Sequence, residues 1–488
     1  MAAKTSTAVS VSSKDTLVGQ IVNFTRLPEG EESYEIAKQG VQALLKEVFT
    51  KKEESARIDK NYVDHLIEEL DKRLSLQMDE ILHHPAFKAI ETPWRSLKFL
   101  VDRTDFKENI KVQYFNVTKA DLLSDFEESA DVSESGLFRQ VYTEEFGQYG
   151  GEPVGVIIGN YDITPSTEDM KFLGYMAQLS AMTHAPFIAA ADESFFGLAD
   201  YSDLSQIKQL EAIFEGPQYN KWRELRDQDV ARNIGLAMPR FMLRSTYGDD
   251  IIVKSFNYKE AISSKKDYVW GNAAFAYGTR LTDSFAQYRW CPNIIGPQSG
   301  GAIKDMPVHI VEKEGKPTVM GPVETVVSDR KEFELAELGF IPLTLRKESN
   351  SAVFFSSHSI QRARQFGNDE EGKQAELNYK LGTQLPYLFI ITRLAHYIKV
   401  LQRENLGSWK GRAELEAELN KWIRQYVADQ ENPSASTRSQ RPLRKASVDV
   451  TETQGDDGWY EINLSVTPHF KFMGANFTLS LTSMIAGE

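Results

Sequence analysis

The sequence contains almost no cysteine, and this scarcity limits its chemistry. Cys291 is the only cysteine among 488 residues, so an intramolecular disulfide and a cysteine-rich zinc site are both excluded. Its position between Trp290 and Pro292 predicts a small buried hydrophobe, because only Arg289 beside it would favour the thiolate. Stability must therefore come from packing and pairing, including pairing with other chains.

The chain also lacks a long hydrophobic run and an excess of positive charge. The longest apolar stretch, 386–391, is followed by Arg393 and Lys399 and is far shorter than the roughly twenty residues of a membrane helix. The Ser/Thr-rich N-terminus has no basic start and apolar run of a secretory signal. The net charge of −14 is the reverse of what a phosphate-backbone binder needs. We expect a cytoplasmic protein without membrane insertion and without nucleic acid.

Histidine is scarce as well. No pair among the eight histidines shows the i, i+4 spacing of a helical metal site. The adjacent His83 and His84 are better explained as the end of a helix, since adjacent side chains on a helix diverge. The sequence therefore predicts no metal and no cofactor.

Two glycine-rich segments look like catalytic motifs but fail on chemistry. In 367–373 (GNDEEGK) the Ser/Thr of a phosphate loop is replaced by Gln374, and Asp369 would face phosphate with like charge. In 296–301 (GPQSGG) no His/Asp pair can be assigned to Ser299, so a structural turn is the better interpretation. An enzyme hypothesis then depends on fold class alone, which is weak support.

Helical periodicity dominates the first hundred residues. We interpret 1–31 as a mobile arm with one short amphipathic helix, which either docks on its own domain or is an exposed peptide for a partner's groove. A second helix is predicted over 32–49. The apolar residues of the short helix are Leu17, Val18, Ile21 and Val22.

The clearest periodicity lies in 61–82, where apolar residues recur at spacings of three and four. The members of this stripe are Val63, Leu66, Ile67, Leu70, Leu74, Met78 and Ile81. The pattern continues from Pro85 through Trp94 and Leu97, with a break or kink expected at Pro93. The resulting helical hairpin has too long a stripe to cover by itself. It needs either the next domain of this chain or the helices of another subunit.

Beyond residue 110 the pattern becomes mixed, and strands alternate with helices as in an α/β unit. The expected strands are 112–117, 154–158 (ending in a turn at Gly159), 185–190, 235–244, 306–311, 322–328 and 351–357. The expected helices are 119–126, 168–182 and 268–290.

The C-terminal part is predicted to hold two helices, 379–402 and 413–428, then a basic linker and a small β unit. The linker, 432–445, carries Arg438, Arg441, Arg444 and Lys445. In the β unit apolar and polar residues alternate, and the apolar members are Tyr460, Ile462, Leu464, Val466, Phe477, Leu479 and Leu481. Such strands leave an edge that must be covered or shared.

Several long runs resemble one known family. They are FNYKEA (256–261), YRWCPNIIGPQSGG (288–301), TQLPYLFIITRLAH (383–396), YVADQENP (426–433) and HFKFMGANF (469–477). Together they resemble the large subunit of the bacterial type VI secretion contractile sheath, the TssC/VipB family, over nearly the whole chain from about residue 30.

The resemblance implies an α+β, multidomain, contractile tail sheath-like fold. Its expected parts are a mobile arm (1–55), a helical hairpin (56–109), a central α/β region (110–378) and a C-terminal inner sheath domain (379–488). The small C-terminal sheet would be completed by strands of neighbouring protomers.

The resemblance also implies a structural, non-enzymatic role. The chain would pair with a small sheath subunit and polymerise around an inner tube of haemolysin-coregulated protein, starting from a baseplate and contracting to drive the tube outward. A Clp-type AAA+ unfoldase would dismantle the contracted form. Two alternatives stay open: another self-assembling scaffold, and an α/β enzyme with an unrecognised site.

Each predicted surface then has an expected role. Leu17, Val18, Ile21 and Val22 would form the unfoldase recognition peptide. The stripe from Val63 to Ile81, with Trp94 and Leu97, would dock the small subunit. The terminal strands would link protomers through main-chain hydrogen bonds. The four basic linker residues would face the inner tube or neighbouring sheath units, or would simply be solvated.

Overall fold

The fold was analysed in a computed structural model of the chain. The structure describes residues 22, 32–50, 60–248, 251–313, 316–347, 349–364, 366–367, 369–407, 411–428, 430, 433–452 and 460–469. The chain divides into two compact units. Unit 1 comprises Met1–Ile81 and Tyr247–Ala261, and unit 2 comprises Leu82–Thr246 and Ile262–Glu488.

Unit 1 contains the two helices predicted before residue 84. Helix α2 spans Glu32–Thr50 and helix α3 spans Lys60–His83, whose last residues already belong to unit 2. Both predictions are confirmed, because three- and four-residue apolar spacing over several turns specifies a helix. The remaining described part of unit 1 is the segment Tyr247–Ala261.

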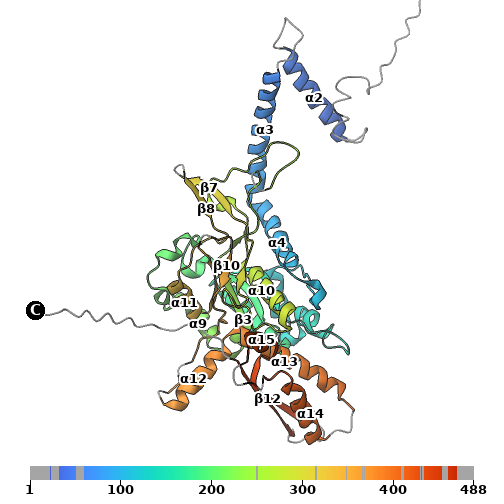
Figure 1. The fold of residues 1–488 in the computed structure, drawn as a ribbon, viewed down its shortest axis with the longest axis vertical. Helices are drawn as coiled ribbons and strands as arrows, with labels where there is room; N and C mark the ends of the chain where they lie inside the picture. Colours follow the sequence, from blue (N-terminus) through green and yellow to red (C-terminus); the bar gives the residue numbers. More distant parts are fainter. Residues whose placement is uncertain are drawn as a thin grey trace, which may run out of the picture. The chain divides into compact units, whose positions relative to one another are not determined.

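Unit 2 holds all other helices and strands of the described chain (Figure 1). Its helices are α4 (Pro85–Asp102), α5 (Lys119–Glu128), α6 (Gly136–Phe138), α7 (Thr167–Thr183), α8 (Leu210–Phe214), α9 (Asn220–Arg226), α10 (Ala273–Tyr288), α11 (Asp329–Glu337), α12 (Glu370–Gly382), α13 (Leu385–Glu404), α14 (Arg412–Arg424) and α15 (Ala435–Gln440). Its strands are β1 (Ile157–Ile163), β2 (Phe187–Ala191), β3 (Ile234–Met238), β4 (Phe241–Met242), β5 (Trp270–Gly271), β6 (Ala302–Ile303), β7 (His309–Lys313), β8 (Lys316–Met320), β9 (Phe340–Leu345), β10 (Ala352–Phe354), β11 (Leu443–Glu452) and β12 (Tyr460–Pro468).

The centre of unit 2 is a six-stranded sheet in the order β1-β2-β3-β9-β10-β6. Strands β1, β2, β3 and β9 are parallel, and β9, β10 and β6 pair antiparallel. All five residues of β2 and of β3 are buried, as expected for parallel strands with both faces covered. One face packs with α7 and α9, and the other with α10 and α13.

Strand β1 begins and ends later in the sequence than predicted. It continues through Gly159, where a turn was expected, with a register shift against β2 between Ile158 and Asp162. A Cβ at this position would lie 2.6 Å from the Phe187 ring, so the glycine is there to admit a neighbouring ring and not to turn the chain.

The strand predicted over 112–117 is wrong. This segment is extended but pairs with no strand in the described chain. The neighbouring edge strand β1 carries a register shift between Ile158 and Asp162, and an irregular edge does not accept a regular partner. The segment is held instead by the Tyr161 hydroxyl, which donates to the Val117 carbonyl at 2.9 Å.

Three further boundaries are corrected. Residues 322–328 form no strand, because only Val323 bridges to Phe241 before the chain turns. The linker predicted over 432–445 contains α15, capped by Ser434, and the start of β11. The long helix predicted over 379–402 is two helices, since Pro386 begins a new one at the N-terminal position where proline is tolerated.

Helix α4 continues through Pro93 without the expected break. An interior proline removes one main-chain hydrogen bond. Tertiary contacts compensate, because Ser96, Phe99 and Leu100 are buried one turn and more beyond it.

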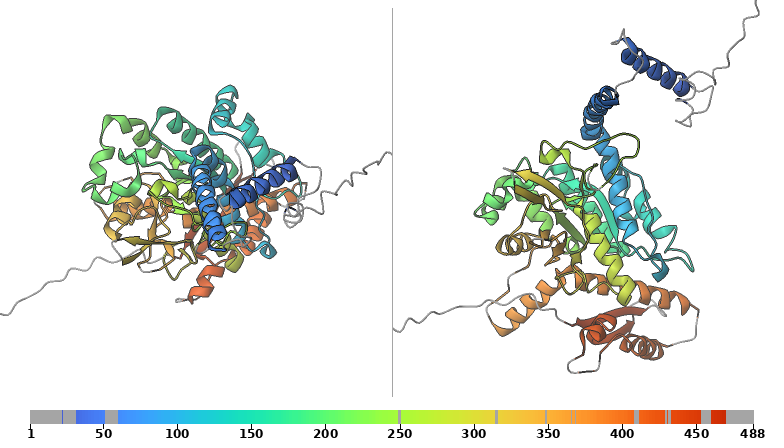
Figure 2. Two further views of the ribbon diagram at one scale, coloured as in Figure 1. Left: turned by 90° about the horizontal axis from the view of Figure 1, so that it is seen from above. Right: turned by 45° about the horizontal axis from the view of Figure 1, so that its top comes forward.

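Helix α13 is buried on more than one side and joins two hydrophobic cores. Leu385, Leu388 and Phe389 pack in the core of the central sheet. Ile390 and Leu394 pack in a separate core with α14 and β11. Figure 2 (right) shows the orange α13 between the central body and the red C-terminal layer. The C-terminal sheet is thus fixed to the central sheet by a shared helix.

His396 of α13 lies in this buried zone, where its Nε2 donates to the Thr183 carbonyl at 3.0 Å. Burial lowers the pKa of His396 to about 4; the Thr183 carbonyl opposes this shift, and His184 and Arg393 add to it. The unfolded chain therefore binds one more proton than the folded chain between this pKa and the ordinary value near 6.5.

We predict that stability falls as the pH is lowered from about 6.5 to 4, by up to about 1.4 kcal/mol per pH unit for this one group. The His396→Phe variant should lose most of that slope in urea unfolding experiments at stepped pH. The exposed His65→Ala variant is the control and should keep the wild-type slope. An unchanged slope in His396→Phe would contradict the assignment.

Candidate functional site

The carboxyl edge of the parallel strands is where an α/β enzyme would carry its site. In open α/β sheets, ligands bind where the strand order reverses. Here β1, β2, β3 and β9 follow one another without reversal, so the parallel part of the sheet has no switch point and no crevice of that kind.

A buried ion network occupies this edge. Arg240, just after β3, pairs with Glu193, just after β2, and its Nε lies 3.1 Å from Glu324 Oε2. Lys265 Nζ donates to the Glu324 carbonyl at 3.1 Å. Tyr201, fully buried, donates to the Ala191 carbonyl at 2.7 Å. Arg240 is therefore paired with two carboxylates, and Lys265 and Tyr201 donate to main-chain carbonyls.

The charges of this network are mutually stabilised. Burial lowers the pKa of Arg240, but Glu324 and Glu193 outweigh it and the net shift is upward. Burial raises the pKa of Glu324, and the Arg240 guanidinium opposes that shift. Removing one partner would strand a buried charge, so the arrangement is typical of a structural network.

The glycine-rich segments that looked like motifs are structural. Asp369 caps α12, and its Oδ1 accepts from the Gly372 N–H at 3.2 Å, in the place where a phosphate loop would hold phosphate. In 296–301 the Gly301 N–H donates to the Gly296 carbonyl at 2.9 Å, which closes a tight turn. Burial raises the pKa of the Cys291 thiol to about 12, so the thiolate is disfavoured.

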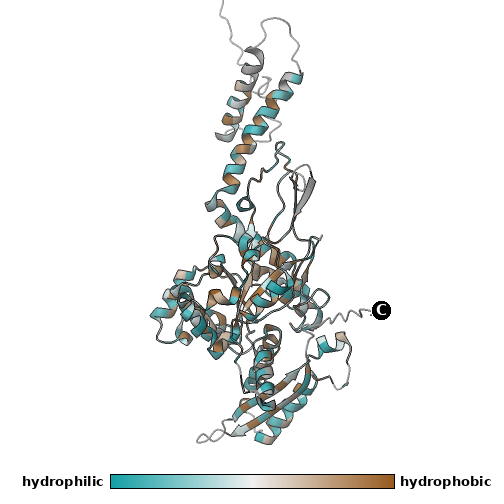
Figure 3. Cartoon of the chain, turned by 90° about the vertical axis from the view of Figure 1, so that its left-hand side faces the viewer, coloured by the Kyte–Doolittle hydropathy of each residue, from teal (hydrophilic) through white to brown (hydrophobic). Residues whose placement is uncertain are grey.

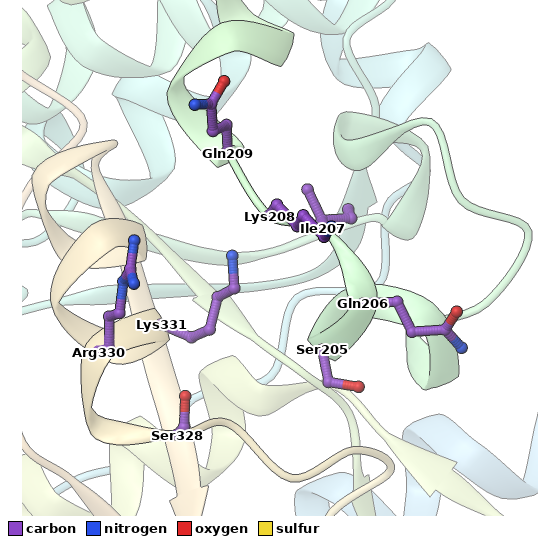
Figure 4. A pocket seen from close by; sticks show the side chains of 8 residues that line it. All are labelled: Ser205, Gln206, Ile207, Lys208, Gln209, Ser328, Arg330 and Lys331. Atoms are coloured by element: carbon purple, nitrogen blue, oxygen red, sulfur yellow. The ribbon is translucent and has the colours of Figure 1, made fainter.

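One open depression was found between the end of the Tyr201–Gln206 turn and the start of α11 (Figure 4). Its volume is about 430 Å³, and its lining is Ser205, Gln206, Ile207, Lys208, Gln209, Ser328, Arg330 and Lys331. Glu334 already pairs with Arg330 and Lys331, at 2.9 and 3.1 Å. The lining of this depression includes no histidine, carboxylate or thiol.

The described part of the chain contains no group of three or more His, Cys, Asp or Glu side chains that could hold a metal ion. Within those same residues, no helix is both long and apolar enough to cross a bilayer.

The stripe on α3 is exposed, in contrast to these closed interior features. Ile67, Leu70, Leu74 and Ile81 are each 45–47% exposed, and Leu66 and Met78 are half-buried. Figure 3 shows the brown, hydrophobic bands recurring along this helix. The side chain of Val63 lies outside the described residues. Apolar patches of this kind mark contact surfaces.

A second exposed apolar surface lies on α4 and the extended segment after it. The Trp94 ring packs against Tyr114, with 5.8 Å between ring centroids. The exposed members of this surface are Phe87, Ile90, Trp94, Val101, Phe106, Tyr114 and Phe115. Leu97 is half-buried at its border. The sequence pattern found Trp94 but missed Tyr114 and Phe115, which were assigned to a strand.

Helix α4 is also anchored by an ionic triad centred on Glu91. Glu91 Oε1 accepts from Arg244 Nε at 3.0 Å and from Arg95 Nε at 2.5 Å. The side chains of Glu91 and Arg244 are only 8% and 4% exposed. The triad fixes how α4 lies on the sheet and hence which residues it exposes.

The C-terminal sheet has one closed and one open edge. Asn420 of α14 takes both main-chain groups of Val448, at 3.0 Å for its N–H and 2.6 Å for its carbonyl. Glu416 and Arg412 bind the N–H and carbonyl of Val450. The outer edge of β11 is therefore blocked by side chains, which the sequence pattern did not reveal.

This blocking also fixes the register of the open edge. Val448 lies opposite Leu464 and Val450 lies opposite Ile462. Because the valines direct their main-chain groups away from β12, these are non-hydrogen-bonded pairs, and Ile462 and Leu464 direct theirs away from β11. The apolar side chains of β12 are half-buried and alternate with exposed ones, as predicted.

The remaining predicted residues fall into two groups. Arg438, in α15, Arg441, which follows that helix, and Arg444 and Lys445, at the start of β11, are all exposed. Leu17, Val18, Ile21, Phe477, Leu479 and Leu481 lie outside the described residues, and Val22 is buried. Among the described residues, the structure thus places predicted interaction residues on the α3 stripe, the α4 surface and the β12 strand.

Comparisons with known proteins agree with this class of protein, a contractile tail sheath subunit. Residues 64–361 match the EvpB/VC_A0108 tail sheath N-terminal domain, and 374–485 match the tail sheath gpW/gp25-like domain of the same family. The chain belongs to this family. It is 35% identical over 467 residues to the type VI secretion system sheath protein TssC1 of Pseudomonas aeruginosa, covering 94% of this chain and 93% of that protein.

A solved helical sheath, that of the anti-feeding prophage in its contracted state, aligns with 73% of this chain and 76% of its own, at 10% identity and a TM-score of 0.34. That similarity is too low to carry an argument. The family membership and the relative's identity establish the chain as a large sheath subunit of a type VI secretion system, a structural component of a contractile sheath.

We predict that Glu91→Leu lowers the free energy of unfolding by about 3 kcal/mol, since it removes the carboxylate that two arginines share in a buried place. Chemical unfolding of the purified chain measures this. The double variant Glu91→Leu/Arg244→Met should recover most of the loss, because burying neither charge is better than burying one. A double variant no more stable than the single one would contradict the triad.

Proposed function

We propose that this chain pairs with a small sheath subunit through the α3 stripe and the α4 surface. The observation that carries the proposal is the exposure of Ile67, Leu70, Leu74 and Ile81 along one side of a helix. Because these side chains are already about half covered, burying the rest of each contributes roughly half of the about 1.5–3 kcal/mol that full burial provides. A partner helix supplies the matching surface, since residues at these spacings interlock with those of a second helix.

The open edge of β12 supports a second contact, between sheath protomers. A two-stranded sheet is marginal by itself, and β12 directs the main-chain groups of Ile462 and Leu464 away from β11, its partner strand among the described residues. A strand donated by a neighbour would satisfy these groups and cover the half-buried apolar face. The C-terminal residues Phe477, Leu479 and Leu481 alternate as such a strand would. The division into parts at 1–55, 56–109, 110–378 and 379–488 belongs to the same proposal.

The remaining roles follow from family membership. The polymer would enclose an inner tube of the haemolysin-coregulated type, start from a baseplate and work in the bacterial cytoplasm without enzymatic activity. The exposed cations Arg438, Arg441, Arg444 and Lys445 would contact the inner tube or adjacent sheath units. The segment from Leu17 to Val22 would present the contracted sheath to a Clp-type AAA+ unfoldase.

Docking on α3 predicts that Leu70→Asp/Leu74→Asp prevents co-purification with the small subunit of the same organism, because two carboxylates would be buried in the contact. Pull-down from coexpressing cells measures this. The matched control, His65→Asp/Lys72→Asp, places the same groups on the other side of α3, where binding should persist. Equal recovery of the partner by both double variants would refute docking on the stripe.

Strand addition predicts that Leu464→Pro yields soluble paired subunits but no tubules, since proline removes an N–H directed to the open edge and leaves the β11 pairing intact. Negative-stain electron microscopy of the coexpressed subunits measures this. Leu464→Ala is the control, because it removes a similar apolar side chain and keeps the N–H. Tubules in the proline variant, or their loss in both variants, would contradict a role for the main-chain edge.

A further inference from the structure

A segment of unit 1, Tyr247–Ala261, forms a strap against α3. It leaves unit 2 after Thr246 and returns at Ile262, so it is a second covalent connection between the units. It contains the FNYKEA run (256–261), which no assembly surface described above uses. The strap is therefore a feature whose role is still unassigned.

Asp79 of α3 accepts hydrogen bonds from the strap. The Tyr258 hydroxyl donates to Asp79 Oδ1 at 2.7 Å, and Tyr258 is only 4% exposed. The Ala261 N–H lies 3.3 and 3.4 Å from the two Asp79 oxygens. One carboxylate thus receives a buried hydroxyl and a main-chain N–H, and hydrogen bonds to a charged acceptor are among the stronger ones.

The strap is also closed on itself. The Tyr247 N–H donates to Glu260 Oε2 at 3.0 Å, and the Glu260 N–H donates to the Tyr247 carbonyl at 2.9 Å. Glu260 is 4% exposed. The rings of Tyr247 and Tyr258 lie 6.1 Å apart. The two ends of the strap are thereby held together beside Tyr258, the residue whose hydroxyl binds Asp79.

Asp79 lies on the side of α3 away from the stripe. It precedes Ile81 by two residues and follows Leu74 by five, and at about 100° per residue both steps lead well over a third of a turn from the stripe. The strap therefore contacts α3 on the side opposite the stripe. Leu70, Leu74 and Ile81 remain exposed, so that a partner can bind them.

We propose that Asp79 is a positioning residue, which holds the strap on α3 and so keeps the stripe in the helical form that the partner helix binds. This inference rests on the proposed docking of the small sheath subunit. A solvent-exposed helix gains little stability from its own propensity. If α3 is already ordered before binding, the free-energy cost of ordering it no longer reduces the affinity.

Preorganisation has a kinetic signature. If only a fraction of the free chains holds α3 in the form that binds the partner, the apparent Kd is larger by the inverse of that fraction. Because the contacts in the complex are unchanged, the loss falls on the association rate and the dissociation rate stays the same. A residue that touches the partner would instead change mainly the dissociation rate.

The test measures association and dissociation of the full-length chain with the small sheath subunit of its organism, using Asp79→Ala and Tyr258→Phe. We expect association to slow about tenfold for Asp79→Ala and less for Tyr258→Phe, with unchanged dissociation. The control Glu68→Ala removes an exposed carboxylate elsewhere on the rear of α3 and should bind as wild type. Wild-type association by Asp79→Ala, or a change confined to its dissociation rate, would overturn the inference.

Hydrogen exchange of the free chain separates this inference from the proposed docking. Amides of α3 should exchange faster in Asp79→Ala than in wild type or Glu68→Ala. A wild-type chain that failed to bind the small subunit would refute the docking proposal. If the α3 amides exchanged at the wild-type rate in Asp79→Ala, the positioning role of Asp79 would be refuted even if the docking proposal stood.

Discussion

The arrangement of unit 2 depends on helix α13, which is buried in two hydrophobic cores. Its residues Leu385 and Phe389 belong to the core of the central sheet, and Ile390 and Leu394 belong to the core beneath β11. Close-packed interiors resist deformation, so the two sheets form one body. Under the proposed strand addition, a pull on β12 would reach the central sheet through α13. A sheath that contracts as a whole requires such stiff subunits joined at their edges.

Charged groups in the interior of the molecule are paired, whereas apolar side chains and main-chain groups on its surface are exposed. The charged groups at the edge of the parallel strands bind one another through Arg240, and the β11 edge is sealed by Asn420. The α3 stripe, the α4 surface and the β12 edge are left open. Exposed apolar surfaces and exposed strand edges are together typical of a chain completed by partners. The chain belongs to a family of tail sheath proteins.

Sequence periodicity predicted the elements whose stability is local or repeated. The helices α2 and α3 and the alternation of β12 agree with it, because three- to four-residue and two-residue spacing map directly onto helix and strand. The errors arise where distant residues decide. Phe187 fixes the place of Gly159, and the edge of β11 depends on Asn420. The hydrogen bond from Tyr258 to Asp79 joins residues 179 positions apart, so no local sequence pattern predicts it. Long-range pairing of this kind overrides propensity.

The central claim is that neighbours complete this chain at the α3 stripe and the β12 edge. A cryo-electron microscopy map of tubules assembled from the two sheath subunits tests it most directly. The account predicts a helix of the small subunit along Ile67, Leu70 and Leu74, and a strand from another chain hydrogen-bonded to Ile462 and Leu464. A map in which the stripe faces solvent, or in which β12 has no second partner, would contradict it.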